Sequence, residues 1–140
     1  MIRFLLDTDH ITLQERAHPG VLARLRQEPS ETLAVSIVTV EESLRGRLAL
    51  LGRSLPAPRL VAAYRNFHAA VRFFEAVAIV PFDLHCAERA QALRDQRLRV
   101  GTLDLRIAAT ALVHDCTLIT RNQQDFSRVP GLHLEDWSIA

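Results

Sequence analysis

Five short apolar runs divide the chain, and longer segments with helical spacing of apolar residues separate them. Short apolar runs between polar segments predict buried strands. Strands that alternate with one or two helices are typical of a parallel sheet covered on both faces. With right-handed crossovers, this pattern predicts a three-layer α/β/α fold. The predicted strands are residues 2–6, 32–37, 77–80, 117–120 and 132–134.

The segments between these runs carry helix signals. One helix after residue 37 places Val40, Leu44 and Leu48 on one face, and Gly52 marks its end. We expect residues 9–27 to form one or two helices broken at Pro19-Gly20, and Thr102 to cap a helix through residue 113. The remaining predicted helices are residues 59–76 and 83–97, with a short turn or helix at 122–126.

Length and composition limit the class of protein. The 140 residues suffice for one domain with one core, and we predict a single domain over 1–140. The apolar fraction is 49%, which argues against disorder. Apolar stretches are too short for a membrane span, and the first strand lacks a signal-peptide pattern, so we expect a cytoplasmic protein. Cys86 and Cys116 show no metal-ligand or redox spacing, which favours two small buried residues.

Net charge gives little indication of a nucleic-acid partner, because it is only +1. All 17 basic residues are arginine, whose planar guanidinium matches phosphate. Genomic composition bias explains this usage at least as well. Arg45, Arg47 and Arg53 follow Glu42 on or just after the same predicted helix; they are either RNA-backbone contacts or a solvated helix face.

Four acids stand at or just beyond the ends of apolar runs: Asp7, Glu42, Asp104 and Asp125. In an open parallel sheet, the carboxyl ends of the strands form the edge where ligands bind. Carboxylates gathered in a dry site repel one another unless a hard cation holds them. Oxygen ligands suit Mg²⁺ or Mn²⁺, and the six histidines lack a paired zinc spacing. This edge is therefore the predicted metal site.

Each of these acids also has a purely structural interpretation. Asp7, or Asp9 two residues later, can be a turn former or helix cap. Glu42 fits a capping box that starts at Thr39, although Ser36 can equally be the cap and leave Glu42 inside the helix.

Asp104 lies in the first turn of a helix, where the macrodipole favours any negative charge. Asp125 follows Asn122 in what can be an ordinary turn. Thr120 and Asn122 can orient a carboxylate or a metal-bound water. Convergence of all four acids on one edge is what favours function over four separate turn formers.

At these residues the chain resembles the PIN-domain ribonucleases, and among them the VapC toxins of toxin–antitoxin pairs. The resemblance implies a five-stranded parallel sheet and Mg²⁺- or Mn²⁺-dependent RNA cleavage, with Asp7, Glu42 and Asp104 as the three principal acids. The fourth acidic position maps to Asn122 or, three residues later, to Asp125. The matching segments are Leu5–Asp9 (with Thr8 and Asp9 as supporting residues), Val38–Gly46, Gly101–Ala109, Leu118–Phe126, Val129–Leu132 and Glu135–Trp137.

The resemblance also implies partners. We expect a VapB-like antitoxin that blocks the acidic groove, transfer RNA as a plausible substrate, and a homodimer. Water attack with departure of the 3′ oxygen would leave a 5′-phosphate and a 3′-hydroxyl. The apolar positions Leu48, Leu50, Leu51 and Leu55 are candidates for the dimer contact, although core packing explains most of them.

Two other functions compete with this one. Asp7-Thr8-Asp9-His10-Ile11 resembles the opening motif of haloacid-dehalogenase-type phosphatases, in which the first Asp is a covalent nucleophile. The chain has no lysine, however, and that family binds phosphate through one. The second alternative is a PIN-like module that binds RNA or a partner without cutting; such a module would be expected to lose a principal acid.

Overall fold

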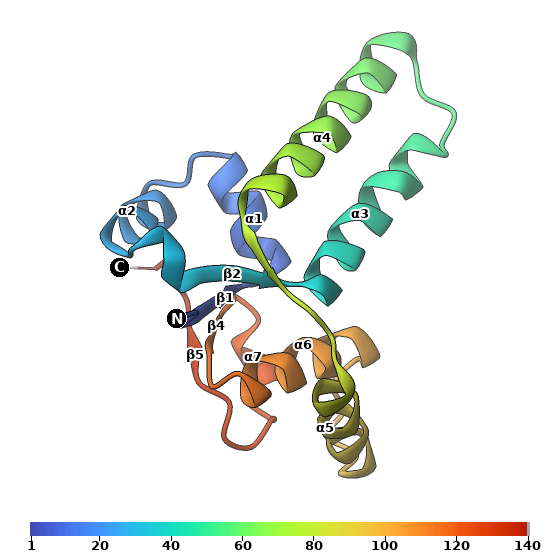
Figure 1. Cartoon of the computed structure of the whole chain (residues 1–140). Helices are drawn as coiled ribbons and strands as arrows, with labels where there is room; N and C mark the ends of the chain where they lie inside the picture. The colour runs from blue at the N-terminus through green and yellow to red at the C-terminus, as the bar shows by residue number, and fades with distance from the viewer. Residues whose placement is uncertain (140) are drawn as a thin grey trace.

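The computed structural model describes residues 1–139 and contains the predicted parallel sheet. Five strands pair in the order β3-β2-β1-β4-β5, and every neighbouring pair is parallel. The fold class predicted from the sequence is therefore confirmed (Figure 1). The strands are β1 (Phe4–Leu6), β2 (Leu33–Ser36), β3 (Ala78–Val80), β4 (Thr117–Ile119) and β5 (Leu134–Glu135).

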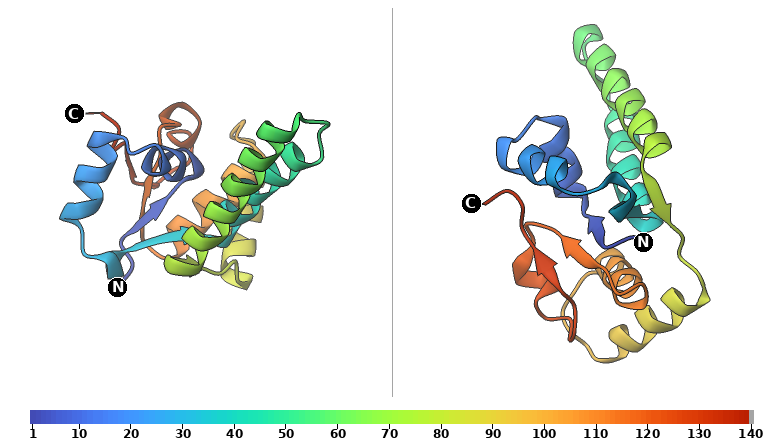
Figure 2. Two further views of the ribbon diagram at one scale, coloured as in Figure 1. Left: turned by 90° about the horizontal axis from the view of Figure 1, so that it is seen from above. Right: turned by 60° about the vertical axis from the view of Figure 1, so that its left-hand side comes forward.

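Helices connect the strands and cover both faces of the sheet. Helices α3 and α4 form a long antiparallel hairpin that extends away from the rest of the molecule (Figure 2). Helices α5 and α6 pack closely against each other on the opposite face of the sheet. The helices are α1 (Thr8–Glu15), α2 (Pro19–Gln27), α3 (Ile37–Leu51), α4 (Ala57–Ala76), α5 (Leu84–Asp95), α6 (Thr102–Val113) and α7 (Gln123–Phe126), with a 3-10 turn, η1, at Ser30–Thr32.

Strand β1 lies in the middle of the sheet, with β2 on one side and β4 on the other. The chain leaves β1 toward β2 and β3, then returns past β1 to form β4. The boundary between β1 and β4 is thus a topological switch point, where the loops after the two strands separate and leave a crevice. Asp7 follows β1 and Thr120 follows β4, so both residues border this crevice.

Two apolar clusters fill the space on the two faces of the sheet. Because side chains alternate along a strand, Leu5 lies in one cluster while Phe4 and Leu6 lie in the other. The Leu5 cluster includes the small residues Ala108 and Ala109 of α6, which allow this helix to approach the sheet closely. The two clusters make up the two interfaces of a three-layer fold.

Several predicted boundaries were wrong. Residues 9–27 do form two helices, but the break lies at residues 16–18, just before Pro19-Gly20. Pro19 is the first residue of α2, where proline needs no hydrogen bond, and His18 accepts the Val21 N–H as a cap. Thr102 is the first helical residue of α6, and Gly101 is the cap. The last strand begins at Leu134 rather than at 132. In residues 1–139, none of the helices is both long and apolar enough to cross a membrane.

Candidate functional site

Asp7 is a buried carboxylate between the end of β1 and the start of α1. Its side chain is only 6% exposed, and its Oδ1 accepts the Thr8 N–H at 2.9 Å, so it caps α1. Burial, and next the charge of Asp9, raise the pKa of Asp7 to about 7, although hydrogen bonds from Thr120 and Thr8 favour the charged form. Asp7 is therefore both a cap, as its structural interpretation proposed, and a carboxyl whose charged form is disfavoured.

The hydroxyl of Thr120 lies between two carboxylates at the switch point. Thr120 Oγ1 is 2.9 Å from Asp7 Oδ2 and 3.2 Å from Asp9 Oδ2, and it accepts the Asn122 N–H at 3.0 Å. A hydroxyl has one proton to donate, so it can satisfy only one of the two acids at a time. Thr120 thus positions Asp7 from the neighbouring strand. The carboxylate that does not receive the hydroxyl proton can still bind a cation.

Asp9 is held directly by the backbone of Arg121, just after β4, and indirectly by Trp137 through His10. Its Oδ2 accepts the Arg121 N–H at 3.0 Å, and its Oδ1 is 2.7 Å from His10 Nδ1. His10 is fully buried, and its Nε2 accepts the Trp137 N–H at 3.1 Å, which leaves the ring proton on Nδ1 to donate to Asp9. Sequence reasoning missed His10, because its partner lies 127 positions away.

Glu42 reaches the same crevice from α3. Ser36 caps α3 by accepting the Val38 N–H at 3.0 Å, so the capping box that began at Thr39 is excluded. The Thr39 hydroxyl is instead buried without a hydrogen-bond partner. Glu42 lies inside the helix, where its Oε1 accepts the Thr8 hydroxyl at 2.5 Å. This bond fixes the Glu42 carboxylate beside the first turn of α1, next to Asp7.

Asp104 lies in the first turn of α6, within range of the charges of Glu42 and Asp125. Burial raises the pKa of Asp104 to about 6, and the charges of Glu42, Asp125 and Asp9 raise it further in that order. Glu42 also contributes to the raised pKa of Asp7. Acids from four separate segments therefore share one electrostatic environment, which we call the acidic site (Asp7, Glu42, Asp104 and Asp125).

Asp125 and Asn122 occupy this site together. Asn122 caps α7 by accepting the Asp125 N–H at 3.3 Å, and its Nδ2 donates to Asp125 Oδ2 at 3.2 Å. Asp125 Oδ1 also lies 3.4 Å from Arg128 Nη1. Asn122 thus orients the Asp125 carboxylate, and Asp125 is the residue of the pair whose charge acts on Asp104.

The composition of the site fits a hard divalent cation. All the side-chain donors of the four acids are carboxylate oxygens, the ligands that Mg²⁺ and Mn²⁺ prefer. Among residues 1–139, no three of these acids offer oxygens that all lie within 4.8 Å of one another. An ion bound here would therefore draw the side chains inward or bind some of them through water.

The profile of the PIN domain family matches residues 4–132. The chain belongs to the PIN domain family. The tRNA(fMet)-specific endonuclease VapC of Salmonella typhimurium is 24% identical over 141 residues, which cover 98% of this chain and 99% of that protein. Ribonuclease VapC1 of Haemophilus influenzae (strain R2866) is 26% identical and covers 96% of this chain and 98% of its own length.

Solved structures show the same likeness in three dimensions. DNA-bound VapBC from Salmonella typhimurium superimposes with a TM-score of 0.81 at 25% identity, covering 98% of this chain and 99% of that one. A toxin–antitoxin complex from Klebsiella pneumoniae gives a TM-score of 0.70 at 26% identity and covers 95% and 96% of the two chains. The prediction of a VapC-like PIN-domain ribonuclease is thus confirmed at the level of the family, and the phosphatase alternative is excluded.

The three arginines proposed as RNA contacts differ in exposure and in the protein groups that they bind. The Arg47 guanidinium donates to both carboxylate oxygens of Glu15, at 2.9 and 3.0 Å, and to the Asn66 carbonyl at 2.8 Å. It therefore ties α3 to α1 and α4, which favours a structural role. Arg45 is exposed and pairs with Glu41 on its own helix, and Arg53 is exposed beyond the end of α3.

Proposed function

We propose that this PIN domain is a Mg²⁺-dependent endoribonuclease of the VapC type, a toxin that hydrolyses RNA phosphodiesters at the acidic site. The observation that supports this most is Asp7, a buried carboxyl whose pKa is raised to about 7 beside Asp9 and Glu42. Such crowding is unfavourable unless a positive partner compensates it. We expect Mn²⁺ to serve as well, because it prefers the same oxygen ligands.

The acids have different tasks in this proposal. A bound divalent ion would activate water and neutralise charge on the scissile phosphate. Asp7 and Asp104 would ligate it directly, and Glu42 and Asp125 directly or through water. Thr8 and Thr120 hold Glu42 and Asp7 in position through their hydroxyls.

Asp9 and Asn122 are supporting residues, because their hydrogen bonds orient Thr120, Arg121 and Asp125. Attack by water on phosphorus, with the 3′ oxygen leaving, would give a 5′-phosphate and a 3′-hydroxyl.

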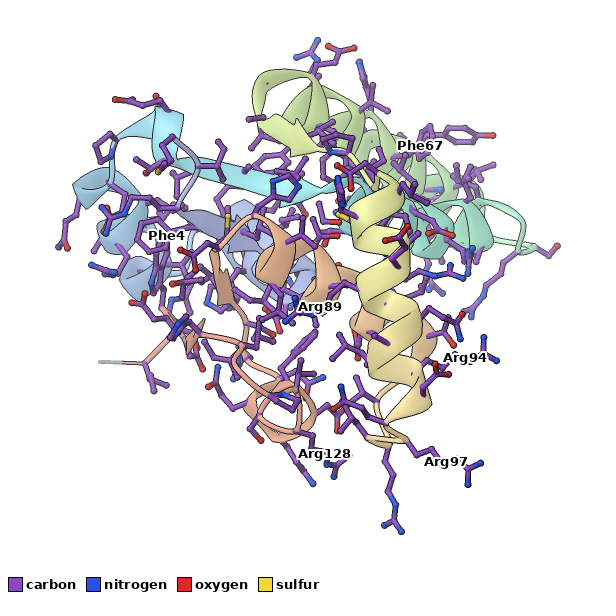
Figure 3. All side chains as sticks on the ribbon, turned by 60° about the horizontal axis from the view of Figure 1, so that its bottom comes forward. Phe4, Phe67, Arg89, Arg94, Arg97 and Arg128 are labelled. Carbon is purple, nitrogen blue, oxygen red and sulfur yellow. The ribbon has the colours of Figure 1, made fainter. Side chains whose placement is uncertain are left out.

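RNA would lie across the acidic site with its phosphates near exposed arginines. Arg45 and Arg53 remain candidates from the sequence. Arg128 joins them because it lies within 3.4 Å of Asp125, and Figure 3 shows Arg97 and Arg128 projecting outward at the same end of the molecule. Contacts of this kind give salt-sensitive affinity that does not depend on sequence. We propose a transfer RNA as substrate, because one full-length relative is a tRNA(fMet)-specific endonuclease.

The partner that we propose is a VapB-like antitoxin, since several structural relatives are toxin–antitoxin complexes. A homodimer and a cytoplasmic location remain predictions. Of the four leucines proposed for the dimer contact, only Leu48 is largely exposed, at 55%. The α3–α4 hairpin also exposes Val61 and Tyr64, at 50% and 57%, so its outer surface offers apolar area for either partner.

The decisive experiment is cleavage of RNA by the purified chain, freed from any antitoxin. Total RNA and initiator tRNA are incubated with Mg²⁺ or with EDTA, and cut ends are mapped by ligation that requires a 5′-phosphate. We expect Mg²⁺-dependent cuts, no cutting by Asp7→Asn, and normal cutting by Glu31→Gln, which alters an exposed acid outside the site.

Cleavage by Asp7→Asn at the normal rate would contradict the proposal. The non-catalytic alternative makes a different prediction, in which RNA binds but stays intact under every condition. Calorimetric titration with Mg²⁺ separates the two further, because a site that has lost its chemistry should show no metal binding that depends on Asp7.

A further inference from the structure

Three side chains of different chemistry meet at the opposite end of α6 from the acidic site. Asp83 caps α5, Cys86 is buried in the first turn of that helix, and His114 follows the end of α6. One ligand atom from each lies within 4.8 Å of the other two. Among residues 1–139, no other group of three His, Cys, Asp or Glu side chains meets this condition.

This group is separate from the acidic site. Asp104 lies in the first turn of α6 and His114 just after its last turn, ten residues later. At 1.5 Å per residue, the two positions are about 15 Å apart along the helix axis. The reaction proposed above uses none of the three residues, so their convergence requires a separate explanation.

We propose that Asp83, Cys86 and His114 form a second metal site, specific for a borderline transition-metal ion such as Zn²⁺. Thiolate, imidazole and carboxylate are the three ligand types of protein zinc sites. A thiolate would also discriminate against Mg²⁺, the ion preferred by the all-oxygen acidic site. The two sites would therefore take different metals from the same solution.

The distances fit this proposal after a small movement. Zinc bonds of about 2.3 Å to sulfur and 2.0–2.1 Å to nitrogen, at tetrahedral angles, place the two ligand atoms roughly 3.6 Å apart. Cys86 Sγ and His114 Nε2 are 4.0 Å apart. Cys86 is fixed by its burial, whereas His114 is exposed and can rotate toward it. Asp83 Oδ1 already accepts the Cys86 N–H at 3.0 Å, which holds this carboxylate next to Cys86 and leaves its Oδ2 for an ion. Three protein ligands would leave the fourth position for water at the surface.

The Cys86 sulfur makes long contacts with its polar neighbours. Its sulfur lies 4.0 Å from the Pro81 carbonyl oxygen and 4.0 Å from His114 Nε2, and both distances are at the outer limit for sulfur. The nearby Cys116 differs, because its sulfur lies 3.5 Å and 3.7 Å from two backbone carbonyl oxygens. Cys116 is therefore a natural control: a buried cysteine of the same fold that lacks the surrounding ligands.

A metal ion bound here would stabilise the packing of α5 against α6 and would take no part in RNA cleavage. Asp83 and Cys86 belong to the start of α5, directly after β3, while His114 belongs to the end of α6. An ion bound by all three would clamp together the helix pair whose other end presents Asp104. The sequence spacing hid this arrangement, because Asp83 and Cys86 are three residues apart but His114 comes from another helix.

Co²⁺ is the appropriate probe, because a cysteine thiolate bound to it gives an intense near-ultraviolet charge-transfer absorption that carboxylates do not. The untagged full-length chain, kept reduced, is titrated with CoCl₂ and then with ZnCl₂. We expect one equivalent of Co²⁺ per chain with thiolate absorption, and its loss when Zn²⁺ displaces it. Asp104→Asn, which alters the acidic site, should leave this signal unchanged.

Variants then assign the ligands. Cys86→Ser should abolish the absorption, and Cys116→Ser should keep it. His114→Gln changes an exposed residue and should weaken Zn²⁺ binding roughly tenfold or more. Asp83→Asn keeps a good helix cap and should weaken it in the same direction. Circular dichroism checks that each variant is folded.

Absence of thiolate absorption in the unmodified chain would overturn the proposal, as would its persistence in Cys86→Ser. Unchanged Zn²⁺ affinity in both His114→Gln and Asp83→Asn would overturn it too. None of these readouts depends on RNA cleavage, so the metal site can fail while the nuclease proposal stands.

Discussion

Replacing Asp7 by asparagine should make the protein more stable at alkaline pH while it abolishes RNA cleavage. The folded protein holds the pKa of Asp7 at about 7, against an ordinary value of 3.8. The folded state therefore keeps a proton that the unfolded chain has already lost, so stability falls as pH rises through this window and the full penalty is present above it. Asparagine has no such proton to lose.

The pKa difference sets the size of the effect. A difference of about 3 at about 1.36 kcal/mol per pKa unit corresponds to about 4 kcal/mol above pH 7. Near pH 5 the unfolded Asp7 is already largely ionised, which leaves roughly 1.5–2 kcal/mol of that penalty. The stability advantage of Asp7→Asn should therefore shrink by about 2–3 kcal/mol between pH 8 and pH 5. Asparagine caps α1 nearly as well as aspartate, so the cap itself should change little.

Urea denaturation in EDTA at pH 5, 6, 7 and 8, followed by circular dichroism, measures this difference. Asp95→Asn is a suitable control, because it makes the same change at an exposed acid at the end of α5, outside the acidic site. Adding Mg²⁺ at pH 8 should then stabilise the unmodified chain, because a ligand that binds only the folded state raises its stability, and should stabilise Asp7→Asn much less.

Two results would refute this reasoning. If Asp7→Asn were less stable than the unmodified chain at pH 8 without divalent ions, burial of Asp7 would not carry the penalty that we assign to it. If its advantage were the same at pH 5 and pH 8, the gain would come from something other than ionisation.

Four further predictions follow from the geometry of the site. Asp104→Asn should reduce cleavage by about 100-fold or more, measured with a labelled tRNA, because it removes a charge at the reacting centre. Mg²⁺ affinity should rise between pH 6 and pH 8, with proton release detected by calorimetry in two buffers, because protons on Asp7 and Asp104 compete with the ion. Thr120→Val should destabilise the fold at pH 8 by about 1–3 kcal/mol in urea, and Thr120→Ser should restore it. Arg47→Ala should lower the free energy of unfolding by about 1 kcal/mol and leave the salt dependence of RNA binding unchanged. Arg45→Ala should reduce the salt dependence of RNA binding and leave the stability unchanged.

The parts of the fold that depend on local pattern were predictable. Buried strands of a parallel sheet are continuous apolar runs, so β1, β2 and β4 could be found from short stretches such as Leu33–Ser36. Their common direction follows from the helices between them. The convergence of Asp7, Glu42 and Asp104 was then a matter of topology, because strand ends of one polarity share one edge.

The features that could not be predicted are the choice between two possible helix caps and the contacts between side chains far apart in the sequence. Ser36 and Thr39 are both good helix caps, and three-dimensional packing, not sequence, selects Ser36 and leaves the Thr39 hydroxyl unpaired. His10 could not be found, because only the folded chain brings Trp137 to it. The same holds for Cys86 and His114, whose approach depends on how α5 packs against α6.

Trp137, far from the four acids in the sequence, also contributes to the position of the acidic site. Asp9 carries its charge toward Asp7 and Asp104, and this side chain is anchored by His10, which in turn accepts the Trp137 N–H. Trp137 packs edge-on against Phe4 of β1, with ring centroids 5.2 Å apart. The closing segment therefore connects the central strand to the carboxylates that follow it. Because His10 and Trp137 are buried while the Asp9 side chain is 32% exposed, the two buried residues are what fix the position of the Asp9 carboxylate.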